Sequence, residues 1–284
     1  NKKYLKLYKV DSNLVNYETE VLENFIDYSV INDDKNHFYS LNASAYRTLA
    51  DSYNDKYEYI LPEIEYDKQL FSDKFGYGNL KSNLKIHNYD TNKYKKTLIN
   101  NFNWEIDRPF SEKIFNGKIL SGLKNINYEY DNVKGFKTNS NNELFGAVGY
   151  LASLDLFKNT VSGSNHLLKP KILLKYAPNY MRKEEGDHNL AKKNLFSLDR
   201  LQSEQNYEGG TNITIGLNYE INDDFNQTNF SIGQIISEKK NNKNMPDTLS
   251  LDNRFSNVVG NLNHKRGDNL NFNYNYSIDQ NLKE

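Results

Sequence analysis

The stretch Asn-Leu-Asn-Phe-Asn-Tyr-Asn-Tyr-Ser-Ile-Asp, which runs from Asn269 to Asp279, alternates polar and apolar side chains at nearly every position. Successive side chains of a β-strand point to opposite faces, so this stretch predicts a strand with one apolar and one polar face. The polar face carries Asn271, Asn273 and Asn275. Such a strand belongs to a sheet with apolar material on one side and water on the other.

The same alternation recurs along the chain. In the segment 212–221, one face carries Ile213, Ile215, Leu217, Tyr219 and Ile221, and the other carries Asn212, Thr214, Gly216, Asn218 and Glu220. Alternation and turn residues together predict roughly thirteen strands, at about the spacing of barrel segments. The clear candidates are 57–66, 80–86, 98–106, 119–130, 144–157, 168–176, 213–221, 230–236, 255–263 and 270–278, and the weaker ones are 4–8, 16–28 and 38–49.

The composition excludes several classes of protein. Only 37% of the 284 residues are hydrophobic, and no stretch approaches the roughly 18 apolar residues of a membrane-spanning helix. The formal net charge is -1, with acidic and basic residues interspersed, so we expect no nucleic-acid partner. The 22 Tyr and 15 Phe favour strands. Because the chain contains no cysteine, disulfides and thiolate metal sites are excluded.

The predicted connections fall into two classes of length. Short turns span 222–227 and 265–268, whereas long polar loops span about 178–210 and 238–253. The two classes alternate along the chain. Outer-membrane barrels have short periplasmic turns and long external loops, so this alternation predicts that the long loops are external.

One segment fits two kinds of structure. The apolar residues Tyr17, Val21, Leu22, Phe25 and Ile26 form a helical stripe about as well as a strand. No other segment predicts an amphipathic helix that could cover a half-apolar sheet. The apolar faces must therefore meet each other in a sandwich or meet lipid. Closure into a barrel also removes sheet edges, so we expect residues 1–284 to form part of a single antiparallel transmembrane β-barrel.

The most distinctive motif lies in the loop 178–210. It consists of Asn194, Leu195, Phe196, Leu198, Asp199, Arg200, Glu208, Gly209 and Gly210. In the functional interpretation, this external loop folds over the barrel lumen, with Asp199 and Arg200 holding it in place. In the structural interpretation the motif serves loop folding alone, because paired glycines permit a tight return of the backbone.

Other candidate sites carry less information. Glu184, Glu185, Asp187 and His188 are close in sequence, but their spacing matches no metal-ligand pattern, and a solvated charge run explains them. No Ser, His and Asp arrangement predicts an enzyme, and nothing predicts a cofactor or a metal. Trp104 either anchors the periplasmic rim of a barrel or packs against a neighbour in the sheet.

The polar faces of two strands predict a lining for a water-filled lumen. The residues concerned are Asn212, Thr214, Asn218, Glu220, Asn271, Asn273 and Asn275. A channel that passes sugar and phosphate groups needs such amides, but a general porin also has a polar interior. The lining by itself therefore does not identify the substrate.

The loop motif and several shorter segments resemble the outer-membrane lipopolysaccharide-assembly protein family, LptD. Residues 194–200 followed by 207–211 are similar to the external-loop signature of that family. The resemblance implies that this loop shapes an exit route from the barrel. Supporting segments occur in the family order, at 4–8, 61–64, 103–104, 108–110, 176–179, 231–234 and 254–260. Gln205 and Asn206 stand where the family often has a second Asp-Arg pair, so the resemblance does not extend to that ion pair.

The resemblance implies the final step of lipopolysaccharide export, in which the glycolipid passes through a barrel into the outer leaflet of the bacterial outer membrane. It implies two partners, an LptE-type lipoprotein plug inside the barrel and a periplasmic bridge that delivers lipopolysaccharide through the jellyroll of the family. We expect this chain to be a central to C-terminal piece, with the jellyroll and the terminal barrel strands outside it. The alternatives are a passive porin or nutrient channel and a soluble β-rich adhesin.

Overall fold

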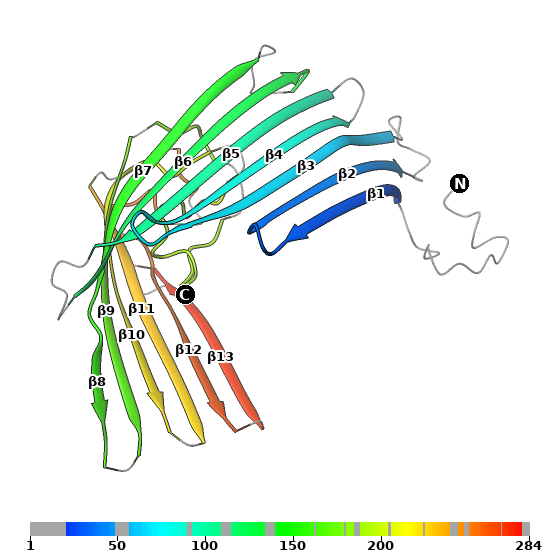
Figure 1. The fold of residues 1–284 in the computed structure, drawn as a ribbon. Helices are drawn as coiled ribbons and strands as arrows, with labels where there is room; N and C mark the ends of the chain where they lie inside the picture. Colours follow the sequence, from blue (N-terminus) through cyan, green and yellow to red (C-terminus); the bar gives the residue numbers. More distant parts are fainter. Residues whose placement is uncertain are drawn as a thin grey trace. The chain divides into compact units, whose positions relative to one another are not determined.

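The chain forms an all-β, antiparallel sheet (Figure 1). The computed structural model describes residues 21–48, 57–89, 93–108, 115–133, 140–161, 163–178, 180–184, 188–203, 206–223, 225–238, 244–246, 250–267 and 269–279. Within these ranges the strands are β1 (Val21–Asn32), β2 (His37–Thr48), β3 (Tyr57–Ser72), β4 (Gly76–Tyr89), β5 (Lys93–Asp107), β6 (Asn116–Asp131), β7 (Asn141–Ser153), β8 (Leu156–Asn159), β9 (Asn165–Ala177), β10 (Gly210–Asn222), β11 (Asn226–Ser237), β12 (Val258–Arg266) and β13 (Leu270–Ile278). Each strand pairs with its neighbours in chain order, except that β7 and β8 both pair with β9. In the same ranges, no helix is long and apolar enough to cross a membrane.

Most predicted strands are confirmed. Nine of the ten clear candidates each overlap one strand, and 38–49 corresponds to β2. The segment that fitted both helix and strand is a strand from Val21 onward, since it forms β1 and pairs with β2. Tyr17 and the candidate 4–8 lie outside the described residues.

The prediction of one strand over 144–157 is wrong. The chain forms two strands there, because β7 ends at Ser153 and β8 begins at Leu156. Between them, the amide of Leu154 donates to the carbonyl of Pro170 on β9, at 3.2 Å. Proline has no N–H with which to return a hydrogen bond, so the ladder is interrupted at this position.

The predicted alternation of connection lengths is confirmed in the second half of the chain. Only 223–225 and 267–269 separate the strands at the two short turns, whereas 178–209 and 238–257 separate them at the long loops. Because neighbouring strands are antiparallel, both long loops leave the same end of the sheet and both short turns leave the other.

In β9 and β10, several residues of the polar face are buried and several residues of the apolar face are exposed. This is the reverse of a sheet in a water-soluble protein. The polar residues Lys175, Asn212 and Thr214 are buried, while Leu174 is 47% exposed and Ile215 is 50% exposed. Register confirms that these residues share faces, since cross-strand partners point the same way and Lys175 pairs with Asn212. We call these the polar face and the apolar face of the sheet.

The chain divides into two compact units. Unit 1 comprises 1–70, 78–102 and 124–144, and unit 2 comprises 71–77, 103–123 and 145–284. In unit 1, ion pairs cross from β4 to β3, with Lys81 to Asp67 at 3.0 Å as an example. Unit 2 contains the long loops and a buried apolar cluster, and it holds the candidate site.

Candidate functional site

The loop between β9 and β10 packs on the polar face of unit 2, together with the loop between β11 and β12. The buried apolar cluster consists of Met181, Leu190, Leu195, Leu201, Ile235, Met245, Leu251 and Val259, with Phe196 packed against it. Only Ile235 and Val259 of this cluster come from strands. The apolar core of unit 2 is therefore made chiefly by the loops, and it covers the polar face of the strands.

Three charged residues form a buried charge cluster beneath the loop. Glu208 forms ion pairs with Arg200 and with Lys175, and the Lys175 Nζ lies 2.9 Å from the Glu208 carboxylate. The side chains of all three are at most 2% exposed. Lys175 comes from β9, whereas Arg200 and Glu208 come from the loop. The charge cluster therefore joins the loop to the strand wall.

Neighbouring polar groups accept further hydrogen bonds from the cations of the charge cluster. The Arg200 guanidinium donates to Thr214 Oγ1 at 2.7 Å, to Asn212 Oδ1 at 3.1 Å and to the carbonyl of Leu195 at 3.1 Å. The Lys175 ammonium also donates to the carbonyl of Glu208, at 3.0 Å. Buried charges are tolerated only when they are paired and hydrogen-bonded in this way.

The carboxylate of Glu208 stays ionised in this setting. Burial alone would raise the pKa of Glu208, but the charges of Arg200 and Lys175 outweigh burial and hold that pKa below its ordinary value. Burial also raises the pKa of the neighbouring Tyr207 phenol, and the carboxylates of Asp199 and Glu208 raise it further.

Two further residues of the motif fix the loop backbone. Asn194 accepts from the amide of Ala191 at 2.8 Å and donates to the carbonyl of Arg200 at 3.2 Å. Asp199 Oδ1 accepts from the amide of Glu208 at 3.4 Å. Asn194 therefore fixes the first half of the motif, and Asp199 joins that half to Glu208 in the second.

Four glycines of the polar face lie directly beneath loop side chains. A Cβ added at Gly216 would lie 2.8 Å from Phe196, and one added at Gly233 would lie 2.5 Å from Leu195. A Cβ at Gly149 would lie 2.7 Å from Leu198. The fourth glycine is Gly122 on β6, where an added Cβ would clash with the Tyr207 hydroxyl. The strand wall therefore offers hollows that fit the apolar side chains of the motif.

The remaining motif positions shape the return of the loop. Gly210 has a φ of 103°, in the region that favours glycine, at the point where the chain enters β10. Asn206, where the family pattern differs, is 2% exposed. Its side chain donates to the carbonyl of Arg182 at 2.8 Å and accepts from the amide of Arg182 at 3.3 Å. An amide thus joins two parts of the loop at this position.

The other predicted lining residues lie on the polar face by register. Asn218 lines a small cavity beneath the loop, and Glu220 pairs with Asn229 of β11. On β13, the three asparagines Asn271, Asn273 and Asn275 pair with β12. Asn261 of β12 donates to Asn273 at 2.6 Å and to Asn275 at 2.8 Å, while Asn271 accepts from Asn263 at 3.5 Å. These residues extend the polar face beyond the part that the loop covers.

The other candidate residues of the sequence are not part of the charge cluster. His188 Nε2 lies 3.2 Å from the Glu184 carboxylate, within hydrogen-bond distance, whereas Glu185 and Asp187 lie outside the described residues. In the described part of the chain, no three His, Asp or Glu residues gather as a metal site would require. Trp104 donates through its indole N–H to the carbonyl of Phe75, at 2.6 Å, in the turn that leads into β4.

Two contributors to the site were not predicted from the sequence. Lys175 sits between Leu174 and Tyr176 and looked like an ordinary strand lysine, although its position in the alternation places it on the polar face. Tyr207 was seen only as part of the loop signature. Of the glycines beneath the loop, only Gly216 was placed on the polar face by the alternation, and nothing in the sequence paired it with Phe196.

The fold and the site together define a class of protein, an antiparallel all-β sheet (Figure 1). In unit 2, apolar side chains are exposed on one face of this sheet, and residues of the long loops pack over part of the polar face. The family model described as "LptD: LPS transport system D" matches residues 1–284, and the chain therefore belongs to the LptD family. This is an outer-membrane family that transports and assembles lipopolysaccharide. None of the curated proteins compared with the chain matches it.

Proposed function

We propose that this chain forms part of the barrel wall of an outer-membrane translocon that delivers lipopolysaccharide to the outer leaflet. The supporting observation is the buried charge cluster, which fixes the family's loop motif on the polar face of the sheet. In a barrel this face is the lumen, and the exposed apolar face contacts lipid. The loop then narrows the lumen and shapes the route of the glycolipid. No chemistry on the substrate is required, so the protein is not an enzyme.

The proposal includes two partners that act with the full-length protein. An LptE-type lipoprotein occupies the part of the lumen that the loop leaves open, and a periplasmic bridge delivers lipopolysaccharide through the jellyroll of the family. The polar asparagines of β12 and β13 support this, because they form an amide-rich surface that the loops of unit 2 leave partly exposed. Such a surface suits contact with a polar plug or with sugar groups.

The test is made in cells that depend on the full-length protein. Asp199→Ala removes a half-buried loop contact and leaves the charge cluster in place, so the barrel should assemble and bind its plug while lipopolysaccharide reaches the surface more slowly. Arg200→Ala should impair assembly as well, because it leaves Glu208 with one partner fewer. Surface lipopolysaccharide, co-purification of the plug and small-solute permeability are measured in the same strains. If depletion of the protein alters only solute uptake and lipopolysaccharide delivery stays normal, the proposal is contradicted and the porin alternative is supported.

A further inference from the structure

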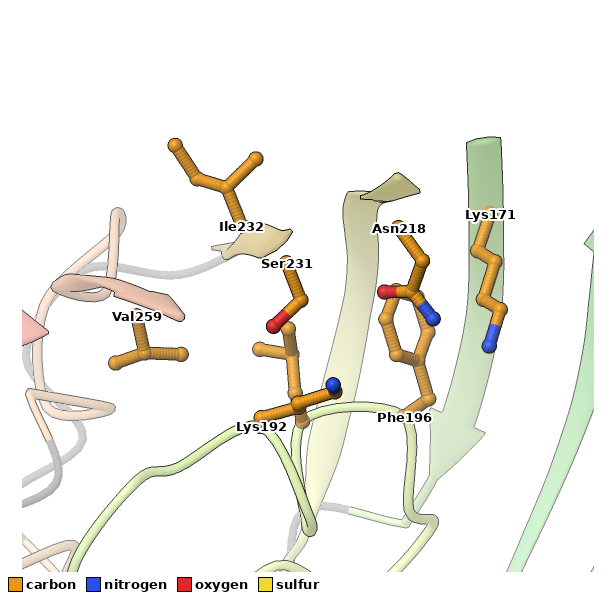
Figure 2. A pocket seen from close by; sticks show the side chains of 8 residues that line it. Lys171, Lys192, Phe196, Asn218, Ser231, Ile232 and Val259 are labelled. Carbon is orange, nitrogen blue, oxygen red and sulfur yellow. The ribbon is translucent and has the colours of Figure 1, made fainter. Parts of the chain in front are cut away.

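A small cavity lies between the loop and the polar face of β9 to β12. Its volume is about 80 Å³, and its lining consists of Lys171, Lys192, Leu195, Phe196, Asn218, Ser231, Ile232 and Val259. Figure 2 shows Lys192 and Phe196 extending from the loop toward the sheet, while Ser231 and Lys171 extend from strands. One buried water needs roughly 10–15 Å³ measured in this way. The cavity therefore accepts a group larger than water but is too small for a sugar chain or an acyl chain.

Two ammonium groups border this cavity. Within the described ranges, neither Lys171 nor Lys192 forms an ion pair, whereas the neighbouring Lys169 pairs with Asp155 at 2.8 Å. The Lys171 Nζ lies 5.8 Å from the centre of the Phe196 ring. With the Asn218 amide oriented to satisfy its neighbours, its oxygen accepts from Lys171 at 3.2 Å. The cavity thus combines two positive charges with an apolar wall.

A buried hydroxyl at the cavity has no protein partner. Ser231 is 3% exposed, and in the described part of the chain its Oγ makes no hydrogen bond to protein. Buried polar groups are nearly always paired, by protein, water or ligand. Its position on the cavity wall (Figure 2) means that a group inside the cavity can supply the missing partner.

We infer that this cavity binds a phosphate group of the glycolipid during its passage, an inference that rests on the proposed function. A phosphate monoester carries a charge of about -1.5 to -2 and three strong acceptor oxygens. The cavity offers two ammonium groups, of Lys171 and Lys192, and one hydroxyl donor, of Ser231. Lysine ammonium groups bind phosphate as point charges. The number and the sign of the donors thus match a single phosphate better than a neutral sugar.

The anion site is tested without transport, on the purified full-length protein with its plug. Inorganic phosphate should protect Lys171 and Lys192 from reductive methylation, followed by mass spectrometry, whereas sodium chloride and acetate at equal ionic strength should protect much less. Lys193, which is adjacent in the loop and outside the cavity lining, is the control and should react equally in all three salts. Ser231→Ala should weaken the protection about tenfold, as expected for loss of one hydrogen bond to a charged group. Equal protection in all salts, or none, would show a cavity that holds water only and would overturn the inference.

The source of the phosphate is tested in the same protein with a photo-crosslinking residue in place of Val259. Phosphorylated lipopolysaccharide should crosslink there, and the double variant Lys171→Gln, Lys192→Gln should lower the yield about tenfold or more, since two charge-assisted contacts are lost. Lys193→Gln should leave it unchanged. Phosphatase-treated lipopolysaccharide should crosslink weakly to every variant, and equal crosslinking of both glycolipids would contradict the inference. A different outcome is also informative: phosphate protects the lysines, but no glycolipid crosslinks and surface lipopolysaccharide stays normal after depletion. That outcome would refute the proposed function and would show a site for free phosphate.

Discussion

At the scale of single residues, the site is governed by the cost of burying charge. Glu208 lies between Arg200 and Lys175, with all three side chains almost fully buried. Desolvation of such ions is expensive, and it is offset only while every partner is present. Asn212 and Thr214 accept the guanidinium protons that Glu208 leaves unpaired. The loop conformation and the strand wall therefore depend on the same few atoms.

The charge cluster predicts a large effect for Glu208→Gln. The neutral amide would leave Lys175 and Arg200 buried without a counter-charge, which costs about 3–5 kcal/mol when one partner of a buried pair is removed. We expect the loop to lose protection against protease and the folded protein to denature at lower temperature. The measurement is heat-dependent mobility on gels with limited proteolysis in outer-membrane vesicles. Glu65→Gln, at an exposed position of β3, should behave like the wild type.

The fit between Tyr207 and the strand wall predicts coupling between two substitutions. In Gly122→Ala the added methyl group would clash with the Tyr207 hydroxyl, while the nearest ring carbon would lie at 3.4 Å, an ordinary contact. The single variant should lose about 1–3 kcal/mol of stability, as overpacking usually does. Adding Tyr207→Phe should recover most of that loss, because the hydroxyl makes by far the closest contact, while Asn103 Oδ1 would lie 3.3 Å away and needs to shift only slightly. Additive losses in the double-mutant cycle would contradict this packing.

At the scale of elements, each strand of unit 2 has two faces with different environments. In the halves of β9 and β10 nearest the loop, polar-face residues such as Lys175 and Asn212 are buried and the apolar face is exposed. On β13, which the loops do not cover to the same extent, the apolar residues Phe272 and Tyr274 remain 49% and 52% exposed. Exposed apolar surface on this scale is typical of contact with lipid.

The two faces predict opposite results for one charge placed at neighbouring positions of β13. Tyr274→Arg should impair membrane assembly, because Arg on the lipid face costs about 2–4 kcal/mol near the bilayer midplane. Asn273→Arg should be tolerated, since this side chain shares the face of Asn261 and points toward water. The measurement is the folded fraction after insertion into lipid vesicles. Equal behaviour of the two variants would mean that the alternation does not separate lipid from lumen.

At the scale of the whole molecule, the antiparallel order fixes which connections share an end. The loops 178–209 and 238–257 leave one end of the sheet, and the turns 223–225 and 267–269 leave the other. Long loops of outer-membrane barrels are external and short turns are periplasmic. The topology of the chain therefore gives an orientation that can be measured in cells.

We expect a cysteine at Lys193, in the long loop, to react with an impermeant thiol reagent on intact cells. A cysteine at Phe225, which is 75% exposed in a short turn, should react only after the outer membrane is permeabilised. These 284 residues contain no cysteine, so they contribute no background labelling. Labelling at Phe225 but not at Lys193 on intact cells would reverse the topology.

The sequence by itself determined the strands, their two faces and the two classes of connection, because alternation and turn chemistry are local properties of the chain. It also placed Asn212 and Thr214 on the polar face, and it singled out Arg200 and Glu208 through the family motif. It did not show the break at Pro170, because the missing N–H matters only opposite Leu154 on a neighbouring strand. Only the tertiary structure decided that Lys175 completes the charge cluster, since residues 33 positions apart meet when the loop folds onto β9. Burial and charge pairing of this kind depend on contacts distant in sequence, and no local pattern encodes them.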